Sequence, residues 1–174
     1  MLNINKVYII GFMGSGKTTT GRKLALMLGW SFTDLDRNIE EYTGMRIPEI
    51  FSDKGEQFFR ETEADLLRKL NPAVNTVIST GGGTPVYSEN MDYMLATGLT
   101  LYLKLTPGQL KTRLAASDGE RPLIRNLTDK ELLGFIEEKL QFREEWYCRA
   151  ELIVSGFDTD IRTIYSEVMT RLSV

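Results

Sequence analysis

The sequence predicts an α/β protein with three layers, in which helices cover both faces of a five-stranded parallel sheet. Five short apolar runs resemble buried strands, and each is separated from the next by a segment with helical periodicity. This alternation is typical of parallel sheets, whose strands are connected through helices. A glycine-rich motif directly follows the first predicted strand and directly precedes the first predicted helix.

The expected elements follow one another in a regular order. The strands are Lys6–Gly11, Ser31–Leu35, Thr76–Ser79, Leu99–Leu105 and Leu152–Val154. The helices are Lys17–Leu28, Gly55–Leu70, Ser88–Thr97, Pro107–Leu114, Thr128–Tyr147 and Asp160–Leu172. Two stretches, Asp36–Phe59 and Ala115–Asn126, interrupt the alternation and are expected to be mobile insertions, the first with short helical pieces around Gly44 and Pro48. No repeat or linker divides the chain, so we expect one domain that spans residues 1–174.

The composition is that of an ordinary globular domain. With 174 residues, 42% hydrophobic and 26% charged, the chain can bury about two thirds of its unfolded surface. A net charge of -3 gives no basic footprint for nucleic acid, and no apolar run approaches the ~20 residues of a membrane span. The first residues also lack the pattern of a signal peptide. We therefore expect a cytoplasmic protein whose partners are neither nucleic acids nor membranes.

Residue types that are rare or missing limit the chemistry. Cys148 is the only cysteine, which excludes an intrachain disulfide. The chain has no histidine, which is the usual base at neutral pH and the commonest zinc ligand. Any metal ion is therefore expected to be held by oxygen atoms.

The glycine-rich loop is the strongest functional signal. Residues Gly11 to Thr18 fit the pattern GxxxxGK[ST], in which backbone N–H groups and the positive end of the following helix surround phosphate oxygens. Lys17 is expected to bridge the β- and γ-phosphates of ATP, and the Thr18 hydroxyl to ligate Mg²⁺. The alternative is a chance match in an inert glycine turn. The expected ATP contacts in and after the loop are Gly14, Ser15, Gly16, Lys17, Thr18 and Thr19.

Two aspartates stand at the carboxyl end of the second predicted strand. Asp34 and Asp36 are two residues apart, so an extended chain would point both side chains toward the ligand-binding edge of the sheet. Asp34 is then placed to hold Mg²⁺ through water, and Asp36 to accept a hydrogen bond or a proton from a substrate hydroxyl. Alternatively, the pair forms a helix N-cap and a solvated turn. The neighbouring phosphate motif favours the functional interpretation.

Further residues form a spaced pattern along nearly the whole chain. They are Asp34–Glu40, Gly44, Ile50-Phe51, Gly55-Glu56, Phe59-Arg60, Glu63, Gly81–Gly83, Arg121–Leu123, Arg143 and Tyr147. Together with the phosphate motif, this pattern resembles the shikimate kinase family. One departure is Glu145, because relatives commonly have a proline between the arginine and the tyrosine.

The resemblance implies a fold, a reaction and a cellular setting. The fold is that of P-loop kinases of the nucleoside-monophosphate-kinase type, with a substrate-binding insertion at about 34–63 and a lid at about 115–126. The reaction transfers the γ-phosphoryl group of ATP, with Mg²⁺, to the 3-hydroxyl of shikimate on the pathway to aromatic amino acids. A monomer in the cytoplasm is also implied.

The resemblance further assigns residues to the acid substrate. Shikimate has a carboxylate and three hydroxyls, so a planar cationic clamp and nearby acceptors suit it. Arg60 and Arg143 would grip the carboxylate, and Asp36 would bind the hydroxyls. The backbone that would approach the ring belongs to Gly81, Gly82 and Gly83.

Simpler interpretations of these residues stay open. By the resemblance, Glu63 would orient the arginines without contacting the substrate. Alternatively, Arg60 could simply pair with Glu56 one helical turn earlier, an interaction of ~0.2–0.5 kcal/mol. The three glycines could form only a flexible turn. Their position directly after a buried parallel strand nevertheless favours a ligand site.

Phosphoryl transfer depends on neutralising the charge of the migrating group. The expected catalytic residues are Lys17, Asp36 and Arg121, and Arg121 would reach the γ-phosphate of ATP when the lid closes. The alternative for Arg121 is a surface Arg-Pro turn. By family position, Arg113 and the segment Ser155–Asp160 would enclose the adenine.

Two other kinds of function compete with this interpretation. A gluconate or nucleoside-monophosphate kinase would share the phosphate motif and differ in the residues that hold the acceptor. A nucleotide-binding switch without catalysis would also keep the motif, because a phosphate loop shows binding and not turnover. The intact set of Lys17, Asp34, Asp36 and Arg121 favours an enzyme.

Overall fold

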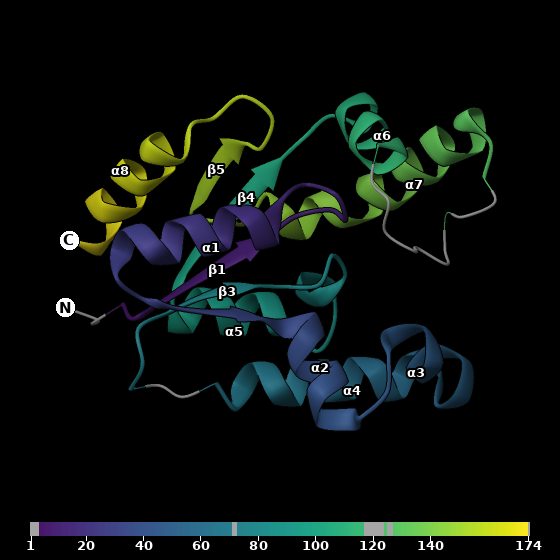
Figure 1. Cartoon of the computed structure of the whole chain (residues 1–174), viewed down its shortest axis with the longest axis horizontal. Coiled ribbons are helices and arrows are strands. Elements are labelled where there is room, and N and C mark those ends of the chain that lie inside the picture. The colour runs from purple at the N-terminus through teal and green to yellow at the C-terminus, as the bar shows by residue number, and fades with distance from the viewer. Residues whose placement is uncertain (1–3, 71–72, 117–123, 125–126, 174) are drawn as a thin grey trace.

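The computed structural model describes residues 4–70, 73–116, 124 and 127–173. Its sheet has five strands in the order β2-β3-β1-β4-β5, and every neighbouring pair is parallel. The strands are β1 (Lys6–Ile10), β2 (Ser31–Asp34), β3 (Thr76–Ser79), β4 (Leu99–Lys104) and β5 (Leu152–Ser155). The predicted fold class is therefore confirmed (Figure 1).

Helices flank the sheet on both sides. They are α1 (Lys17–Leu28), α2 (Leu35–Thr43), α3 (Ile47–Asp53), α4 (Gly55–Arg68), α5 (Asn90–Thr97), α6 (Pro107–Ala115), α7 (Asp129–Tyr147) and α8 (Ile161–Leu172), with a short 3₁₀ helix, η1 (Thr84–Val86). Along β1, Val7 and Ile9 pack with residues of α1 and α8, whereas Tyr8 and Ile10 pack with residues of α5 and α7. No described helix is long and apolar enough to cross a membrane.

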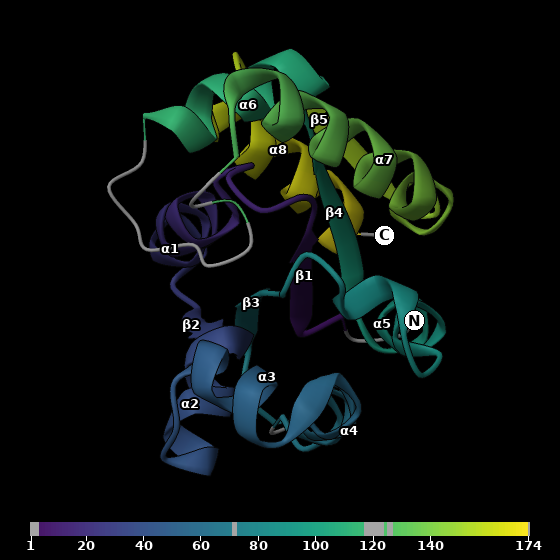
Figure 2. The same cartoon turned by 90° about the vertical axis from the view of Figure 1, so that its right-hand side faces the viewer.

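Helices α2, α3 and α4 form a separate unit beside the sheet. Figures 1 and 2 show the three helices gathered below the strands, on the side where β2 ends. The unit packs on the domain through Leu35, Ile39, Ile50 and Phe59, which belong to the same core cluster as Tyr8 and Ile10. It covers most of the first stretch that interrupts the predicted alternation.

The end of β2 differs from the prediction. The strand stops at Asp34, because the Asp34 carboxylate caps α2 by accepting a hydrogen bond from the backbone N–H of Arg37 at 3.4 Å. Asp36 consequently lies in the first turn of a helix. The expectation that both carboxylates project from one extended strand was wrong.

The parallel register brings three chain segments to one edge of the sheet. Asp34 at the end of β2 pairs with Ser79 at the end of β3, and Ser79 pairs with Ile9 of β1. The glycine loop leaves β1 and the run Gly81–Gly83 leaves β3 at this same edge. The carboxyl edge of the sheet is therefore where the predicted site residues meet.

Candidate active site

The loop between β1 and α1 has a backbone conformation that requires glycine at three positions. Gly11, Gly14 and Gly16 have φ angles of 145°, 79° and 95°, which side-chain-bearing residues rarely adopt. The turn is closed by a hydrogen bond from Ser15 N to Phe12 O at 3.1 Å. The Lys17 ammonium donates to the carbonyls of Gly11 and Phe12, each at 2.9 Å, so its charge is held against the loop.

Two side chains of this loop region suit a phosphate and its cation. Ser15 Oγ is the buried side-chain oxygen that has no hydrogen-bond partner among the described residues. The Thr18 hydroxyl donates to Asp34 Oδ2 at 2.8 Å and lies 3.4 Å from Ser79 Oγ. Since the Thr18 proton points to Asp34, the lone pairs of its oxygen suit a hard cation such as Mg²⁺.

The Asp36 carboxyl lies among other charged groups. Burial, Glu63 and Asp34 raise its pKa to about 6, while Lys17 and Arg60 act in the opposite direction. The carboxyl is thus ionised at neutral pH but close to titration. A group with these properties can accept a proton from a hydroxyl.

The glycine run after β3 allows side chains to approach its backbone. A Cβ atom at Gly81 would lie 2.8 Å from Glu63 Oε1 and 3.0 Å from Asp36 Oδ1. A Cβ atom at Gly82 would lie 3.2 Å from Arg143 Nη1 and 3.4 Å from the backbone N of Met13 in the phosphate loop. The run therefore lies beside both the phosphate loop and the side chains predicted to hold the acid.

Arg60 is held by two carboxylates. Its Nη1 donates to Glu63 Oε2 at 2.9 Å, and its Nε donates to Glu56 Oε1 at 3.3 Å. Glu63 is fully buried and also accepts a hydrogen bond from Thr84 Oγ1 at 2.5 Å. The simple pair with Glu56 is thus present, but the buried contact with Glu63 fixes the guanidinium beside the glycine run.

Arg143 approaches the site from α7. Its guanidinium carbon lies 5.5 Å from the ring centroid of Phe12, a residue of the phosphate loop. One turn later, the buried Tyr147 hydroxyl donates to the carbonyl of Gly82. Burial raises the pKa of Tyr147 to about 12, so the hydroxyl keeps its proton. Helix α7 continues through Glu145 without interruption.

A cavity of about 480 Å³ adjoins the phosphate loop. Its lining includes Gly16, Thr19, Arg113, Phe157 and Asp160. Arg113 donates to the carbonyls of Ser15 at 2.9 Å and Gly156 at 2.7 Å, and its guanidinium carbon lies 5.6 Å from the Phe157 ring centroid. The segment expected to enclose the adenine is therefore beside Arg113.

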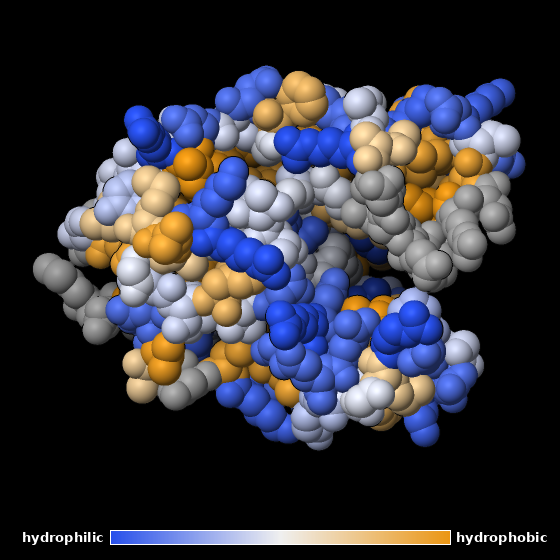
Figure 3. All heavy atoms as spheres, in the orientation of Figure 1, coloured by the Kyte–Doolittle hydropathy of each residue, from blue (hydrophilic) through white to orange (hydrophobic). Residues whose placement is uncertain are grey.

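The structure brings together most of the predicted site residues and adds others. Arg121 lies outside the described residues, so its expected role stays a prediction. Figure 3 shows the surface hollowed between the unit of α2, α3 and α4 and the rest of the molecule. Thr84 and Tyr87 contact the predicted residues but had no local sequence signal, because their partners are more than 20 residues away.

A phosphate loop at the carboxyl edge of a parallel sheet, beside a cluster of arginines and carboxylates, defines the class of P-loop kinases that act on small molecules. The shikimate kinase family profile matches residues 13–173, and the chain is 38% identical over 165 residues to the shikimate kinase of Parabacteroides distasonis, covering 95% of this chain and 94% of the relative. The chain belongs to the shikimate kinase family.

Two solved structures extend the comparison. Shikimate kinase from Bacteroides thetaiotaomicron superposes with a TM-score of 0.89 at 35% identity, over 97% of this chain and 98% of that one. Shikimate kinase from Acinetobacter baumannii, solved in complex with shikimate, gives a TM-score of 0.84 at 30% identity, over 99% and 94% of the two chains.

Proposed function

We propose that the protein transfers the γ-phosphoryl group of ATP to the 3-hydroxyl of shikimate, producing shikimate 3-phosphate and ADP. One observation carries this proposal. The Gly81–Gly83 backbone lies close both to the side chains of Asp36, Arg60 and Arg143 and to the backbone of the phosphate loop. A carboxylate held by the arginines would leave a ring hydroxyl between the phosphate loop and the Asp36 carboxyl.

The loop residues are suited to hold the nucleotide. The Lys17 ammonium would exchange its carbonyl contacts for the β- and γ-phosphates, and the N–H groups of Gly14 to Thr19 would surround the phosphate oxygens. Mg²⁺, held by the Thr18 hydroxyl and through water by Asp34, would neutralise charge on the phosphates. Arg113 and the turn after β5 would enclose the adenine.

Asp36 would serve as the acceptor of the hydroxyl proton. Its carboxyl has the raised pKa of about 6 that suits a group taking a proton near neutral pH. Arg60 and Arg143 would bind the carboxylate through charge-assisted hydrogen bonds. Arg121 would stabilise the migrating phosphoryl group from a lid at about residues 115–126, in a single kinase domain that acts as a cytoplasmic monomer.

The test measures ADP formation with ATP and Mg²⁺ while shikimate, gluconate or a nucleoside monophosphate is added separately. We expect turnover above the no-acceptor background with shikimate alone. Lys17→Met serves as an inactive control, because it removes the ammonium but keeps a side chain of similar length. Turnover with another acceptor only would contradict the proposed substrate, and ATP binding without any turnover would favour a nucleotide switch.

A further inference from the structure

The Arg60 guanidinium has one edge that is not occupied by a carboxylate. Glu56 and Glu63 accept from Nε and Nη1. Among the described residues no hydrogen bond engages Nη2, which would lie 2.7 Å from a Cβ atom at Gly83. Nη1 would lie almost as close to this Cβ atom, at 2.8 Å, but it already donates to Glu63. Nη2 is therefore the donor beside the glycine run, where the proposed substrate carboxylate would lie, that has no carboxylate partner among the described residues.

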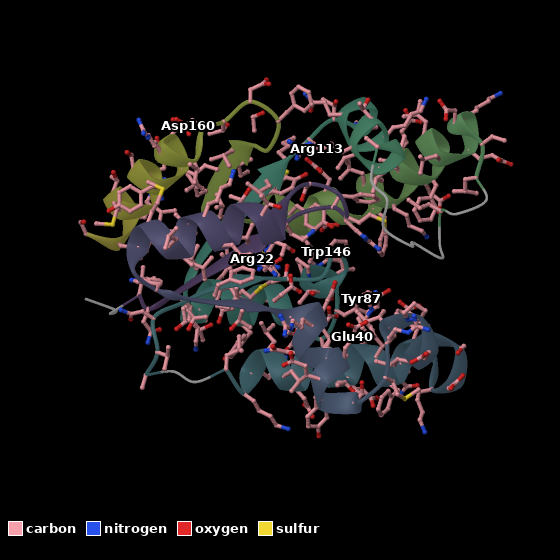
Figure 4. All side chains as sticks on the ribbon, viewed as in Figure 1. Arg22, Glu40, Tyr87, Arg113, Trp146 and Asp160 are labelled. Atoms are coloured by element: carbon pink, nitrogen blue, oxygen red, sulfur yellow. The ribbon has the colours of Figure 1, made fainter. Side chains whose placement is uncertain are left out.

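Tyr87 contacts this clamp in two ways. Its ring centroid lies 4.4 Å from the Arg60 guanidinium carbon, closer than the 5.0 Å of the neighbouring Phe59 ring. Its hydroxyl donates to Glu56 Oε1 at 3.3 Å, the same oxygen that accepts from Arg60 Nε. Figure 4 shows Tyr87 between the sheet edge and the unit that contains α4. The tyrosine thus joins the segment after the glycine run to the helix that carries Arg60.

The turn that presents Tyr87 is firmly held. Ser88 and Glu89 have positive φ angles of 51° and 54°, which is why the helix predicted from Ser88 begins only at Asn90. Arg68 donates to Ser88 O and to Asn90 Oδ1, each at 2.7 Å. The buried Asn90 side chain donates in turn to Thr84 O at 3.0 Å. These hydrogen bonds fix the backbone that directly follows Tyr87, and so they fix the position of Tyr87 itself.

We propose that Tyr87 is a positioning residue that sets the affinity for the carboxylate of the acid substrate; this rests on the proposed function. An arginine side chain on a helix has many rotamers, and ordering it on binding weakens affinity. The Tyr87 ring attracts the guanidinium through its π-electrons, and its hydroxyl steadies Glu56. Arg60 is thereby held with Nη2 toward the glycine run before the substrate arrives.

The first test compares three variants in steady-state kinetics. Tyr87→Leu should raise the KM for shikimate about tenfold, with kcat changed by less than about twofold and the KM for ATP unchanged. Tyr87→Phe keeps the ring and should raise the KM for shikimate by only about twofold. Tyr42→Leu is the matched control, because Tyr42 is an exposed tyrosine of α2 whose ring lies 5.9 Å from Lys69 Nζ and outside the site.

A second test separates positioning from a general structural role. Dissociation constants of shikimate and of its carboxamide are measured by calorimetry on the parent enzyme and on Tyr87→Leu. We expect the variant to weaken shikimate about tenfold and the carboxamide by less than about twofold, because the amide has no charge for Arg60 to bind. Equal weakening of both ligands would overturn the proposal in favour of a structural role.

The remaining outcomes distinguish this inference from the proposed function. If the parent phosphorylates shikimate and Tyr87→Leu has the parent KM, only the role of Tyr87 is overturned. If the parent does not use shikimate, both are overturned. Should Tyr87→Leu fail to fold, Tyr87→Phe and Glu56→Gln replace it, and a parent-like KM for shikimate in both would overturn the proposal.

Discussion

The two glycine clusters of the site require glycine for different physical reasons. Gly11, Gly14 and Gly16 have positive φ angles, so the phosphate loop needs them for backbone conformation. The run Gly81–Gly83 has no positive φ, and here it is space that requires glycine, because Cβ atoms would meet the side chains of Asp36, Glu63, Arg60 and Arg143. One cluster shapes a backbone, and the other makes room for side chains.

This difference teaches how the two halves of the site are built. In the proposed function, the nucleotide half would hold the phosphates of the nucleotide by backbone groups of one contiguous loop and the start of α1. The acceptor half would hold the acceptor by side chains from α2, α4 and α7, which the glycine run allows to converge. Substitutions in the two halves should therefore affect different substrates, and each prediction below tests that separation.

The largest expected effect comes from Asp36→Asn. The amide cannot accept the hydroxyl proton, so kcat should fall by about 10²–10⁴-fold, while the dissociation constant for ATP stays within about twofold. Assays of ADP formation measure kcat, and calorimetry measures the dissociation constant for ATP. Asp53→Asn, on the exposed end of α3, is the matched control and should be silent. A parallel loss of ATP binding in Asp36→Asn would contradict the separation.

Gly16→Ala should damage the nucleotide half alone. A side chain at φ 95° is strained by about 1–2 kcal/mol, and the new Cβ would lie 3.2 Å from Arg113 Nη1. We expect the affinity for ATP to fall tenfold or more, while the affinity of the free enzyme for shikimate is kept. Gly108→Ala is a control with open space at its Cβ position. Weakened shikimate binding in Gly16→Ala would show that the halves are coupled.

Gly83→Ala should damage the acceptor half alone. The methyl group would lie 2.7–2.9 Å from the Arg60 guanidinium, which is the far end of a flexible side chain and can move aside. The fold should therefore survive, but the KM for shikimate should rise about tenfold because the clamp is displaced. The KM for ATP and the melting temperature report the other half and the fold. Gly134→Ala on α7, with open space around it, is the control.

The smallest effect is a pH dependence that Asp36 imposes on both activity and stability. Because its carboxyl has a raised pKa of about 6, kcat/KM should fall as the pH drops below 6. The unfolded chain releases this proton near the ordinary value of 3.8, so the native state loses stability as the pH rises from about 4 to 6.

Thermal unfolding of Asp36→Asn tests whether ionisation of Asp36 lowers the stability of the native state. At pH 8 the variant should melt about 2–4 °C above the parent, which corresponds to about 1 kcal/mol, because it removes an unfavourable buried charge. At pH 3.5 the two melting temperatures should nearly agree, since the parent carboxyl is then protonated in the native state and largely protonated in the unfolded chain. A variant that melts lower at pH 8 would show that the ionised carboxylate stabilises the fold.

Residues close in sequence allowed much of the fold to be predicted. Apolar runs and helical periodicity predicted the five strands and six of the helices, because burial and hydrogen bonding act within each segment. Helices α2 and α3 instead lie in the stretch that was expected to be an insertion with short helical pieces. The order of the strands was not predictable in this way, since alternation indicates parallel pairing but not which strands are neighbours. The predicted strand continued past Asp34, but in the structure Asp34 caps α2 and the strand ends there.

The sequence by itself determined the phosphate loop, because the conformation, the lysine and the hydroxyl it needs all lie between Gly11 and Thr18. Only the tertiary structure decided the contact of Arg60 with Tyr87 and the raised pKa of Asp36. Both depend on which side chains are packed and desolvated against one another across distant segments. Such packing is a property of the folded core, and no local pattern encodes it.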